Sequence, residues 1–428
     1  MTLPPIRFGT DGVRGPSGQW PITPEGAKAI GAGLASWLFD THGHAPRVLV
    51  GRDPRTSGRV LVDALLDGVR ESGGHGSDLE ILPTAAVSCA VDEAGATAGV
   101  MVTASHNPAA DNGIKVLGAG GRKLSKPEAA ALESWFDRPV PRPGGSQSIA
   151  SAPLSAWDAW LPTVDLTGLT ILIDAAHGAG AVSAPAALAR MGATLVRRGC
   201  APTGENINAG VGALHPPSRA EVQAAGAQLA ICLDGDADRV ALVCPEQGLL
   251  DGDDLLWLMR GLFEGPIVGT VMSNGGLEAA LAGRLVRSPV GDAHVAEAMR
   301  KTGAQMGAEP SGHVLFSDGM PTGDGLYAAL RVLQAAAGSD GIPVLPLAAG
   351  GWSRWPVVKQ NLRFTGERIP LDSLDSIRAA QAAGNRLVVR YSGTEPKLRI
   401  LVEGPSEPAM HVQAVADEFT ARVGSTRT

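Results

Sequence analysis

Three aspartates near the middle of the chain have the spacing of a metal-binding loop. Asp234, Asp236 and Asp238 alternate over five residues, directly after an apolar run at 229–233 that predicts a buried strand. Two carboxylates about 4 Å apart repel by about 4 kcal/mol at an effective dielectric of 20, so their convergence requires a cation. Oxygen ligands favour Mg²⁺ before Ca²⁺, and Pro245 stands where an EF-hand needs glutamate. The alternative is a solvated acidic turn.

A serine loop follows another apolar run. Residues 103–108 read Thr-Ala-Ser-His-Asn-Pro and come directly after the strand predicted at 99–102. We therefore place Ser105 in a tight turn at the carboxyl end of a strand, which is the edge of an open α/β sheet where ligands bind. Ser105 and His106 are not a hydrolase dyad, because sequence neighbours rarely face one another. A polar turn without chemistry is the alternative.

The N-terminal segment has the composition of a phosphate-binding loop. Residues 7–15 contain three glycines and two arginines. Glycines let the backbone approach a ligand closely, and the planar guanidinium of Arg14 matches phosphate oxygens. An ordinary turn with a solvated arginine is the alternative. Lys115 lies in a short strand predicted at 112–116, just beyond the serine loop.

A second phosphate-binding pattern lies near the C-terminus. Two predicted strands, 386–390 and 397–402, flank a turn that carries backbone N–H groups, two hydroxyls and two guanidinium groups. Such a turn can hold a phosphate that does not react, although a decorated hairpin is the alternative. The residues concerned are Arg390, Ser392, Gly393, Thr394 and Arg399.

Alternating strands and helices position these loops, which predicts mostly parallel sheets covered on both faces. A proline-rich stretch at 137–153 reads as a linker, and a glycine- and proline-rich stretch at 338–351 reads as a hinge. Further strands are expected at 48–50, 170–174, 194–196, 240–243 and 267–272. Helices are expected at 24–39, 57–71, 155–161, 255–263, 277–282, 293–301 and 409–423, with two more ending near 190 and 337.

Length and composition limit the possible functions. The 428 residues exceed one core and indicate several domains. The formal net charge of −7 disfavours a nucleic-acid partner. Neither an apolar run of the ~18 residues that a membrane span needs nor a signal-peptide pattern is visible. The four cysteines form no metal-type spacing, so we expect free thiols in a cytoplasmic protein.

Taken together, the motifs resemble those of the α-D-phosphohexomutase family over essentially the whole chain. They are, in order, FGTDGVRG, TASHNP, NINAGVGALHP, DGDADR, VGTVMSN, EPSGH, TGDG and YSGTEPKLR. The resemblance implies three similar α/β domains and a C-terminal α+β domain of the TATA-box-binding-protein-like kind around a central cleft. We expect these domains at 1–148, 149–250, 251–362 and 363–428.

The resemblance also implies roles for individual residues. Ser105 would be a phosphoserine, whose phosphate binds one Mg²⁺ together with Asp234, Asp236 and Asp238. The other catalytic residues implied are Arg14 and Arg239 at the transferring phosphoryl group, and Lys115, His106 and His313 for proton transfer. The substrate-binding residues implied are Glu309 and Ser311 for sugar hydroxyls, and Arg390, Ser392, Gly393, Thr394 and Arg399 for the non-reacting phosphate.

The implied reaction interconverts glucosamine 6-phosphate and glucosamine 1-phosphate through a sugar bisphosphate, and feeds UDP-N-acetylglucosamine and cell-wall synthesis. The expected partner is a small phosphosugar, with no nucleic acid or membrane, in a monomer or homodimer. Three motifs, FGTDGVRG, NINAGVGALHP and VGTVMSN, favour glucosamine, but no single residue visibly reads an amino group. The alternatives are a phosphomannomutase or phosphoglucomutase, a Mg²⁺-dependent phosphatase with Asp234 as nucleophile, and a non-catalytic sensor.

Overall fold

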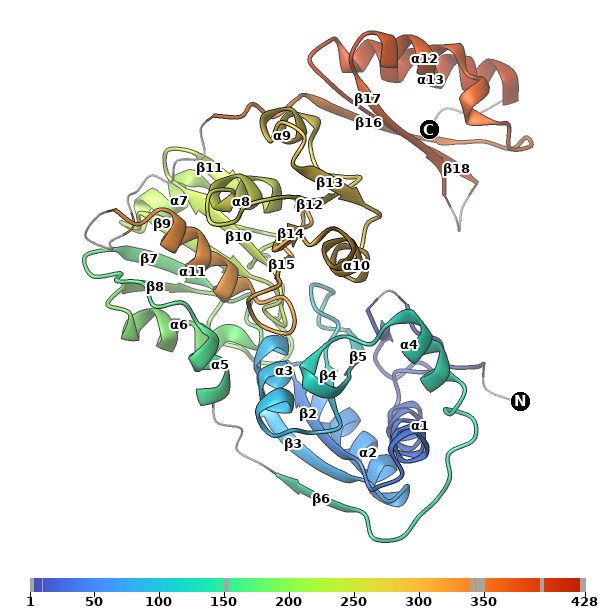
Figure 1. Ribbon diagram of the computed structural model, residues 1–428, viewed down its shortest axis with the longest axis vertical. Coiled ribbons are helices and arrows are strands. Elements are labelled where there is room, and N and C mark those ends of the chain that lie inside the picture. The colour runs from blue at the N-terminus through green and yellow to red at the C-terminus, as the bar shows by residue number, and fades with distance from the viewer. Residues whose placement is uncertain are drawn as a thin grey trace. The chain divides into compact units, whose positions relative to one another are not determined.

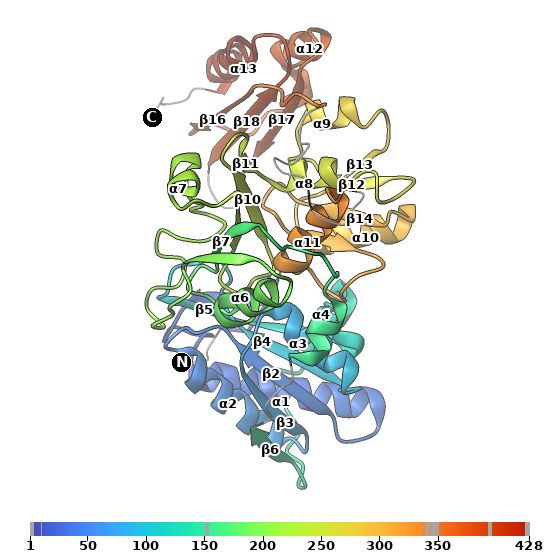
Figure 2. The same ribbon diagram turned by 90° about the vertical axis from the view of Figure 1, so that its left-hand side faces the viewer.

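The computed structural model describes residues 4–9, 11–149, 154–338, 343, 351–392 and 396–423. The chain folds into two compact units, each made of two stretches of sequence (Figures 1 and 2). The first unit comprises Met1–Val268 and Pro289–Ala348. The second comprises Gly269–Ser288 and Ala349–Thr428. Among the described residues, no helix combines the length and the apolar character that crossing a bilayer requires.

A six-stranded mixed sheet begins the first unit and carries the serine loop (Figure 1). Its strand order is β1-β5-β4-β2-β3-β6, for β1 (Val13–Pro16), β2 (Arg47–Arg52), β3 (His75–Ile81), β4 (Ala98–Val102), β5 (Asp111–Leu117) and β6 (Ser146–Ile149). The pairs β2–β3, β2–β4 and β3–β6 are parallel, whereas β5 runs antiparallel to both β4 and β1. The antiparallel pair places Lys115 opposite Met101, beside the end of the strand that leads to Ser105.

Helices cover both faces of this sheet. One face packs against α1 (Pro24–His42) and α2 (Gly58–Glu71), in a core that includes Val50, Val100 and Ile114. The other face meets α3 (Thr84–Glu93), whose Val87 and Val91 lie against the backbone of Gly51 and Gly99. The η1 turn (Ala119–Gly121) and α4 (Lys126–Glu133) complete this part of the unit.

A five-stranded sheet follows and carries the aspartate loop. Its strand order is β11-β10-β9-β7-β8, for β7 (Thr170–Asp174), β8 (Thr194–Arg198), β9 (Leu229–Leu233), β10 (Val240–Cys244) and β11 (Gly248–Leu250). β7 runs parallel to β8 and β9, while β9–β10 and β10–β11 are antiparallel. The associated helices are α5 (Ser155–Trp160), α6 (Gly180–Arg190) and α7 (Arg219–Ala224).

The remainder of the first unit is a smaller α/β layer. β12 (Ile267–Thr270) pairs in parallel with β14 (Met306–Ala308) at Val268 and Gly307, and β15 (Val314–Phe316) pairs antiparallel with β14. Its helices are α8 (Gly252–Met259), α10 (Asp292–Thr302) and α11 (Gly325–Ala335).

The second unit is built on a three-stranded antiparallel sheet, β16-β18-β17, of β16 (Val357–Arg363), β17 (Arg386–Tyr391) and β18 (Lys397–Glu403). Both α12 (Asp375–Ala382) and α13 (Pro408–Val423) lie on one face of it, over a core that includes Leu398, Ile400 and Phe419 (Figures 1 and 2). The unit also holds η2 (Leu371–Ser373), α9 (Gly275–Ala280) and β13 (Leu285–Ser288).

Two sequence expectations are corrected by this fold, and a third falls largely outside the described residues. The proposed linker at 137–153 contains strand β6, which pairs with β3 in parallel and leaves its side chains exposed. The sheets are mixed, because the strands that follow the serine and aspartate loops run antiparallel to those that precede them. The predicted hinge at 338–351 lies almost wholly outside the described residues.

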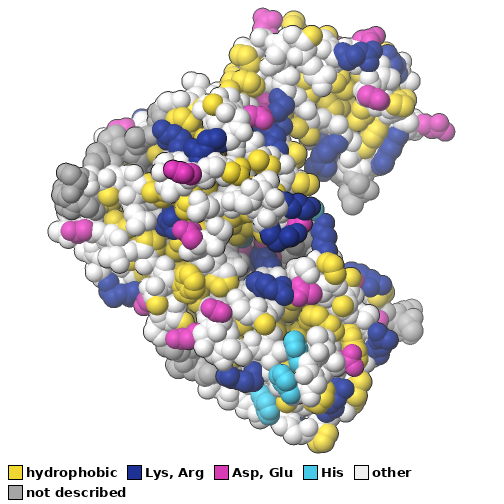
Figure 3. All heavy atoms as spheres, in the orientation of Figure 1, with side chains coloured by type: hydrophobic (Ala, Val, Ile, Leu, Met, Phe, Trp, Pro, Cys, Tyr) yellow, Lys and Arg dark blue, Asp and Glu magenta, His cyan; other side chains and the backbone are white. Residues whose placement is uncertain are grey.

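Charged side chains of both signs are interspersed over the visible face of the protein, with Lys and Arg next to Asp and Glu (Figure 3). Among the buried residues, by contrast, aspartates are frequent. Ten aspartates of the described chain are buried, and three of them, Asp234, Asp236 and Asp238, lie in the loop between β9 and β10.

The contact between α1 and α2 generates a test of the fold. Gly68 on α2 lies so close to α1 that an added Cβ would come within 2.2 Å of the carbonyl oxygen of Lys28. Helix propensity alone favours alanine over glycine by about 1 kcal/mol, but overpacking of this kind typically costs about 1–3 kcal/mol. We expect Gly68→Ala to lower the unfolding midpoint in a denaturant titration followed by circular dichroism.

The matched control is Gly261→Ala, where an added Cβ meets no atom within 4 Å. This control should leave the midpoint nearly unchanged. A Gly68→Ala protein at least as stable as wild type would show that the two helices are not packed this closely.

Candidate active site

Ser105 is held in a strained backbone conformation at the end of β4. Its φ of 50° lies in the left-handed region that non-glycine residues rarely adopt, and such residues concentrate at functional sites. Its N–H donates to Thr103 Oγ1 at 2.8 Å, which closes the turn. The hydroxyl then donates to Asp234 Oδ2 at 2.6 Å and lies 3.3 Å from His106 Nδ1. The predicted serine and the predicted metal loop are therefore in direct contact.

The backbone of this serine loop is held from two sides. The carbonyl oxygen of Ser105 accepts from Arg55 Nη2 at 3.0 Å and from Asn208 Nδ2 at 2.8 Å. The carbonyl oxygen of Asn107 accepts from the same two donors, at 2.8 and 2.9 Å. Arg55 is fully buried and paired with Asp53 at 2.9 Å. Because both donors come from outside the loop, they fix the position of the serine.

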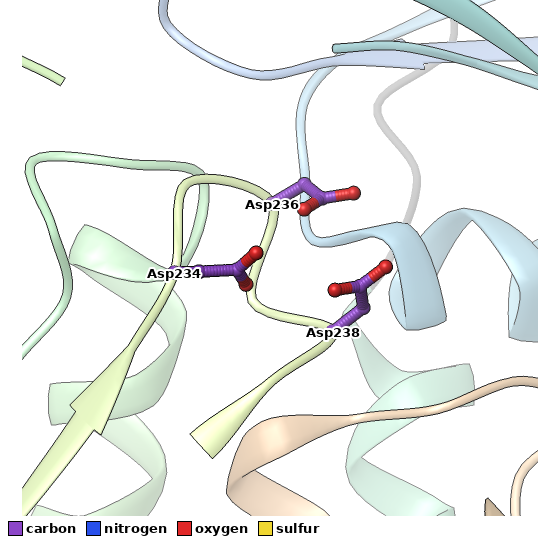
Figure 4. Close-up of side chains that lie close together, drawn as sticks. All are labelled: Asp234, Asp236 and Asp238. Atoms are coloured by element: carbon purple, nitrogen blue, oxygen red, sulfur yellow. The ribbon is translucent and has the colours of Figure 1, made fainter. Parts of the chain in front are cut away.

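The aspartate loop presents its three carboxylates together between β9 and β10. Figure 4 shows Asp234, Asp236 and Asp238 projecting from this single loop, and one oxygen of each lies within 4.8 Å of the others. All three are at most 3% exposed. Ala237, at φ 61°, makes the reversal that brings them together. Oδ1 of Asp236 and Oδ1 of Asp238 are buried without a hydrogen-bond partner in the described chain.

These unpartnered oxygens fit a hard divalent cation. Buried polar atoms are normally hydrogen-bonded, so two orphaned carboxylate oxygens a short distance apart call for a ligand. The charge count agrees, because six carboxylates here face four lysine and arginine side chains, which leaves two negative charges when every carboxylate is ionised. The carboxylates are those of Asp11, Asp234, Asp236, Asp238, Asp292 and Glu309, and the cations are Arg14, Lys115, Lys123 and Arg239.

Lys115 reaches the aspartates from β5. Its Nζ lies 2.7 Å from Asp236 Oδ2, 2.9 Å from Asp238 Oδ2 and 2.9 Å from Asp11 Oδ2. Burial lowers the pKa of Lys115, but the three carboxylates outweigh burial and raise it well above the usual value. Burial likewise raises the pKa of Asp238, yet Lys115 and His313 hold it well below the ordinary range. These three carboxylates therefore favour the ammonium form of Lys115.

The pKa values of the other two titratable groups beside Ser105, Asp234 and His106, are shifted in the direction that favours their neutral forms. Burial, followed by repulsion from Asp238 and Asp236, raises the pKa of Asp234 to about 7. Burial, followed by Arg239 and Arg14, lowers the pKa of His106 to about 4. Next to the serine oxygen the site thus holds a neutral imidazole and a carboxylate that loses its proton only near neutral pH.

Three further charged residues, Asp11, Lys123 and Asp292, belong to the site but were not singled out from the sequence. They connect Lys115 to His313 through a series of ion pairs. Asp11 pairs with Lys115 and Lys123, Lys123 pairs with Asp292, and Asp292 lies 3.8 Å from Nε2 of His313. His313 Nδ1 in turn lies 3.7 Å from Asp238 Oδ1. Asp11 stands within the FGTDGVRG motif, so its sequence signal was available, whereas Lys123 and Asp292 had none.

Most of the predicted site residues of the first unit line one cavity of about 700 Å³. Glu309, on the loop between β14 and β15, accepts from the backbone N–H of Gly291 at 2.8 Å. The predicted residues that line the cavity are Arg14, His106, Asp238, Arg239, Glu309, Ser311 and His313. The cavity is large enough for a phosphosugar and adjoins the serine loop through His106.

The predicted phosphate cradle belongs to the second unit. Arg390 and Arg399 are exposed and lie directly opposite each other on β17 and β18. Like charges at opposed positions of a sheet destabilise it, so this pair is suited to a bound anion. Ser392 is buried, with its N–H donating to the carbonyl oxygen of Lys397 at 2.8 Å. Gly393 and Thr394 lie outside the described residues.

Four phosphoglucomutase/phosphomannomutase family models match the chain in order. The alpha/beta/alpha domains I, II and III match residues 5–140, 159–248 and 251–354. The C-terminal domain matches residues 363–421. The sheets described above are those expected for this arrangement, so the predicted fold class, three α/β domains followed by a C-terminal α+β domain, is confirmed.

Individual proteins are similar over nearly the whole chain. A phosphoglucosamine mutase from Sorangium cellulosum (strain So ce56) is 41% identical, covering 96% of this chain and 91% of its own. One from Anaeromyxobacter sp. (strain Fw109-5) is 38% identical, covering 97% and 96%. A crystal structure of a phosphoglucomutase/phosphomannomutase family protein from Burkholderia thailandensis has a TM-score of 0.77 at 23% identity, covering 97% and 98%.

The geometry of the aspartate loop generates a metal-binding prediction. Asp236 and Asp238 are the two carboxylates of this loop that face Lys115. Asp238→Asn removes one of these two negative charges and replaces one of the three carboxylate ligands with a weaker amide ligand. We expect Mg²⁺ affinity, measured by isothermal titration calorimetry, to fall at least ~10-fold, since changes around metal ligands commonly cost 10–100-fold.

Asp165→Asn serves as the control, because Asp165 is exposed and outside this site. It should bind Mg²⁺ as the wild type does. Unchanged affinity in the Asp238→Asn protein would remove this loop as the metal site.

Proposed function

Because this chain belongs to the phosphoglucomutase/phosphomannomutase family, we propose that it interconverts glucosamine 6-phosphate and glucosamine 1-phosphate. It is a phosphohexomutase, an intramolecular phosphotransferase. One observation carries the proposed chemistry: the Ser105 hydroxyl donates to Asp234 at 2.6 Å, inside a buried group of three carboxylates. A serine in that position can carry a phosphoryl group next to a divalent cation.

The proposed reaction moves a phosphoryl group in two balanced transfers. In the first, the 1-hydroxyl of glucosamine 6-phosphate gives up its proton and forms a P–O bond, while the P–O bond of phosphorylated Ser105 breaks and the serine oxygen takes up a proton. In the second, after the bisphosphate has turned, the Ser105 hydroxyl gives up its proton and forms a P–O bond to the 6-phosphoryl group, while the bond to the 6-oxygen breaks and that oxygen takes up a proton. The product is glucosamine 1-phosphate, and the serine is phosphorylated again.

We propose that Asp234, Asp236 and Asp238 hold one Mg²⁺ together with the phosphate of Ser105. When bound, the ion supplies positive charge that stabilises the phosphoryl group during transfer. The two orphaned aspartate oxygens and the excess of two negative charges support this assignment. A phosphoserine adds about −1.5 to −2 charge, so another phosphate can approach only where cations offset it.

Proton transfer is assigned to the groups nearest the reacting oxygen. His106 lies 3.3 Å from Ser105 Oγ, and Lys115 contacts two of the aspartates. We propose that these two residues exchange the proton, with His313 oriented by Asp238 as a third candidate. Arg14 and Arg239 line the cavity and supply guanidinium groups for the transferring phosphoryl group.

The sugar and its non-reacting phosphate are assigned to two sets of residues. Glu309 and Ser311 line the cavity and would bind sugar hydroxyls. Arg390 and Arg399, with Ser392 and the turn that includes Gly393 and Thr394, would bind the phosphate that does not react. Because the intermediate must turn end for end, this cradle has to accept either of its phosphates.

The choice of glucosamine is supported by the two curated relatives described above, from Sorangium cellulosum and Anaeromyxobacter sp., which are phosphoglucosamine mutases. We propose that the product supplies the synthesis of UDP-N-acetylglucosamine and of the cell wall in the cytoplasm. The proposed enzyme works as a monomer or homodimer, with a sugar bisphosphate as activator and intermediate.

The direct test replaces the serine. We expect Ser105→Ala to lose glucosamine 6-phosphate isomerisation by at least ~10⁴-fold, because a covalent carrier of the phosphoryl group has no substitute in the site. The measurement is turnover with Mg²⁺ and the bisphosphate present, together with a circular dichroism melt to establish that the variant folds.

Ser134→Ala, which removes an exposed hydroxyl on the surface, should keep full activity. Wild-type turnover in Ser105→Ala would refute the phosphoserine. Release of inorganic phosphate by that variant would instead favour the alternative phosphatase, in which Asp234 is the nucleophile.

The phosphate cradle gives a separate prediction. Arg399→Gln removes one of two opposed guanidinium groups, so KM for glucosamine 6-phosphate should rise about 10- to 100-fold, the value of a charge-assisted hydrogen bond of about 1.5–3 kcal/mol. Arg378→Gln, at an exposed arginine of α12, is the control and should leave KM unchanged. A KM equal to that of wild type in Arg399→Gln would exclude this residue from substrate binding.

A further inference from the structure

Two acidic residues that line the cavity are connected through one backbone contact. Asp292 begins helix α10, and Glu309 lies on the loop after β14. Gly291 joins them, because its N–H donates to Glu309 Oε1 at 2.8 Å while it directly precedes Asp292. Gly291 has a φ of 118°, which only glycine adopts readily, so this backbone is shaped for the contact. Both carboxylates line the cavity.

Two arginines also line the cavity. Arg14 and Arg239 both act electrostatically on His106 of the serine loop. The cavity thus offers guanidinium groups for a phosphate and carboxylates for a positively charged group. The phosphate of a sugar without an amino group carries no positive charge for these carboxylates to bind.

Few cationic side chains contact Asp292. Among the described residues, Lys123 is its only lysine or arginine partner, and Lys123 is shared with Asp11. Asp11 is better supplied, since Lys115 and Arg14 also pair with it at 2.9 and 2.6 Å. Asp292 thus has one such partner against three for Asp11, so a further cation would stabilise Asp292 more than it would stabilise Asp11.

A second, independent feature points to a ligand at the same place. Nε2 of His313 is buried, lacks a hydrogen-bond partner in the described chain and lies 3.8 Å from Asp292 Oδ2. The His313 side chain is 4% exposed, and the residue lines the cavity. A polar group of a ligand beside Asp292 would meet an atom that the protein leaves unsatisfied.

We propose that Asp292 is a specificity-determining residue that binds the ammonium group of a 2-amino-sugar phosphate. The inference rests on the proposed function, and it names the residue that distinguishes glucosamine 6-phosphate from glucose 6-phosphate. The two sugars differ only in carrying an ammonium or a hydroxyl at C2. A carboxylate binds an ammonium through a charge-assisted hydrogen bond, which is about twice as strong as one to a neutral donor.

The test compares kcat/KM for glucosamine 6-phosphate and glucose 6-phosphate in the full-length enzyme with Mg²⁺ and bisphosphate. Asp292→Asn keeps the shape of the side chain and removes its charge. We expect the ratio of the two kcat/KM values to fall about 10- to 100-fold, mainly through a higher KM for the aminosugar, as for loss of a charged hydrogen bond. Activity on glucose 6-phosphate should change much less.

Asp292→Asn leaves Lys123 with Asp11 as its remaining ion-pair partner, which could disturb folding. The double variant Asp292→Asn with Lys123→Gln removes one charge of each sign and so controls for this effect. The double variant should lose the preference for glucosamine 6-phosphate as fully as Asp292→Asn does, whereas Lys123→Gln alone should keep that preference. Glu297→Gln, on the outer side of the same helix, is the control and should behave as wild type.

The outcomes separate the two claims. A wild-type enzyme that does not prefer glucosamine 6-phosphate would overturn the proposed function and this inference with it. A wild-type preference that persists in both Asp292→Asn variants, or an equal loss with both sugars, would overturn the role of Asp292 alone.

Discussion

The structure depends on one electrostatic constraint: several carboxylates are buried at a single point. Asp234, Asp236 and Asp238 lie within 4.8 Å of one another, out of contact with solvent. Charges removed from water persist only where other charges compensate them, and in this protein the compensation comes from neighbouring strands and loops. Lys115 from β5 and Arg239 beside the loop supply part of it. The remaining excess of negative charge supports the proposed binding of a divalent ion at this site.

The same constraint explains why some site residues could be predicted and others could not. Ser105 and the three aspartates stand in short, dense motifs at strand ends, so local sequence alone indicated both their chemistry and their position. Lys123 and Asp292 are ordinary charged residues in sequence, and 169 positions separate them. They acquire a role only when the fold brings them next to Asp11 and His313.

The fold was predictable where periodicity was strong and less so elsewhere. The strand at 170–174 and the helices around 58–71 and 408–423 are found close to where the pattern placed them. Strand β6 was read as linker because proline and polar residues surround it, and only its pairing with β3 makes it a strand. The mixed direction of the sheets was also missed, since hydrophobic pattern does not report whether neighbouring strands run parallel.

Two side chains from outside the serine loop fix its position, and this has a consequence for how the sugar preference of such an enzyme can change. Arg55 and Asn208 bind main-chain carbonyl oxygens, so they anchor the loop without depending on which sugar is present. The residues on the wall of the cavity, around Gly291 and Glu309, belong to other elements. In the proposed mechanism Ser105 would therefore stay in place while the bisphosphate turns. New sugar preferences can then arise by exchanging wall residues while the transfer apparatus is inherited intact.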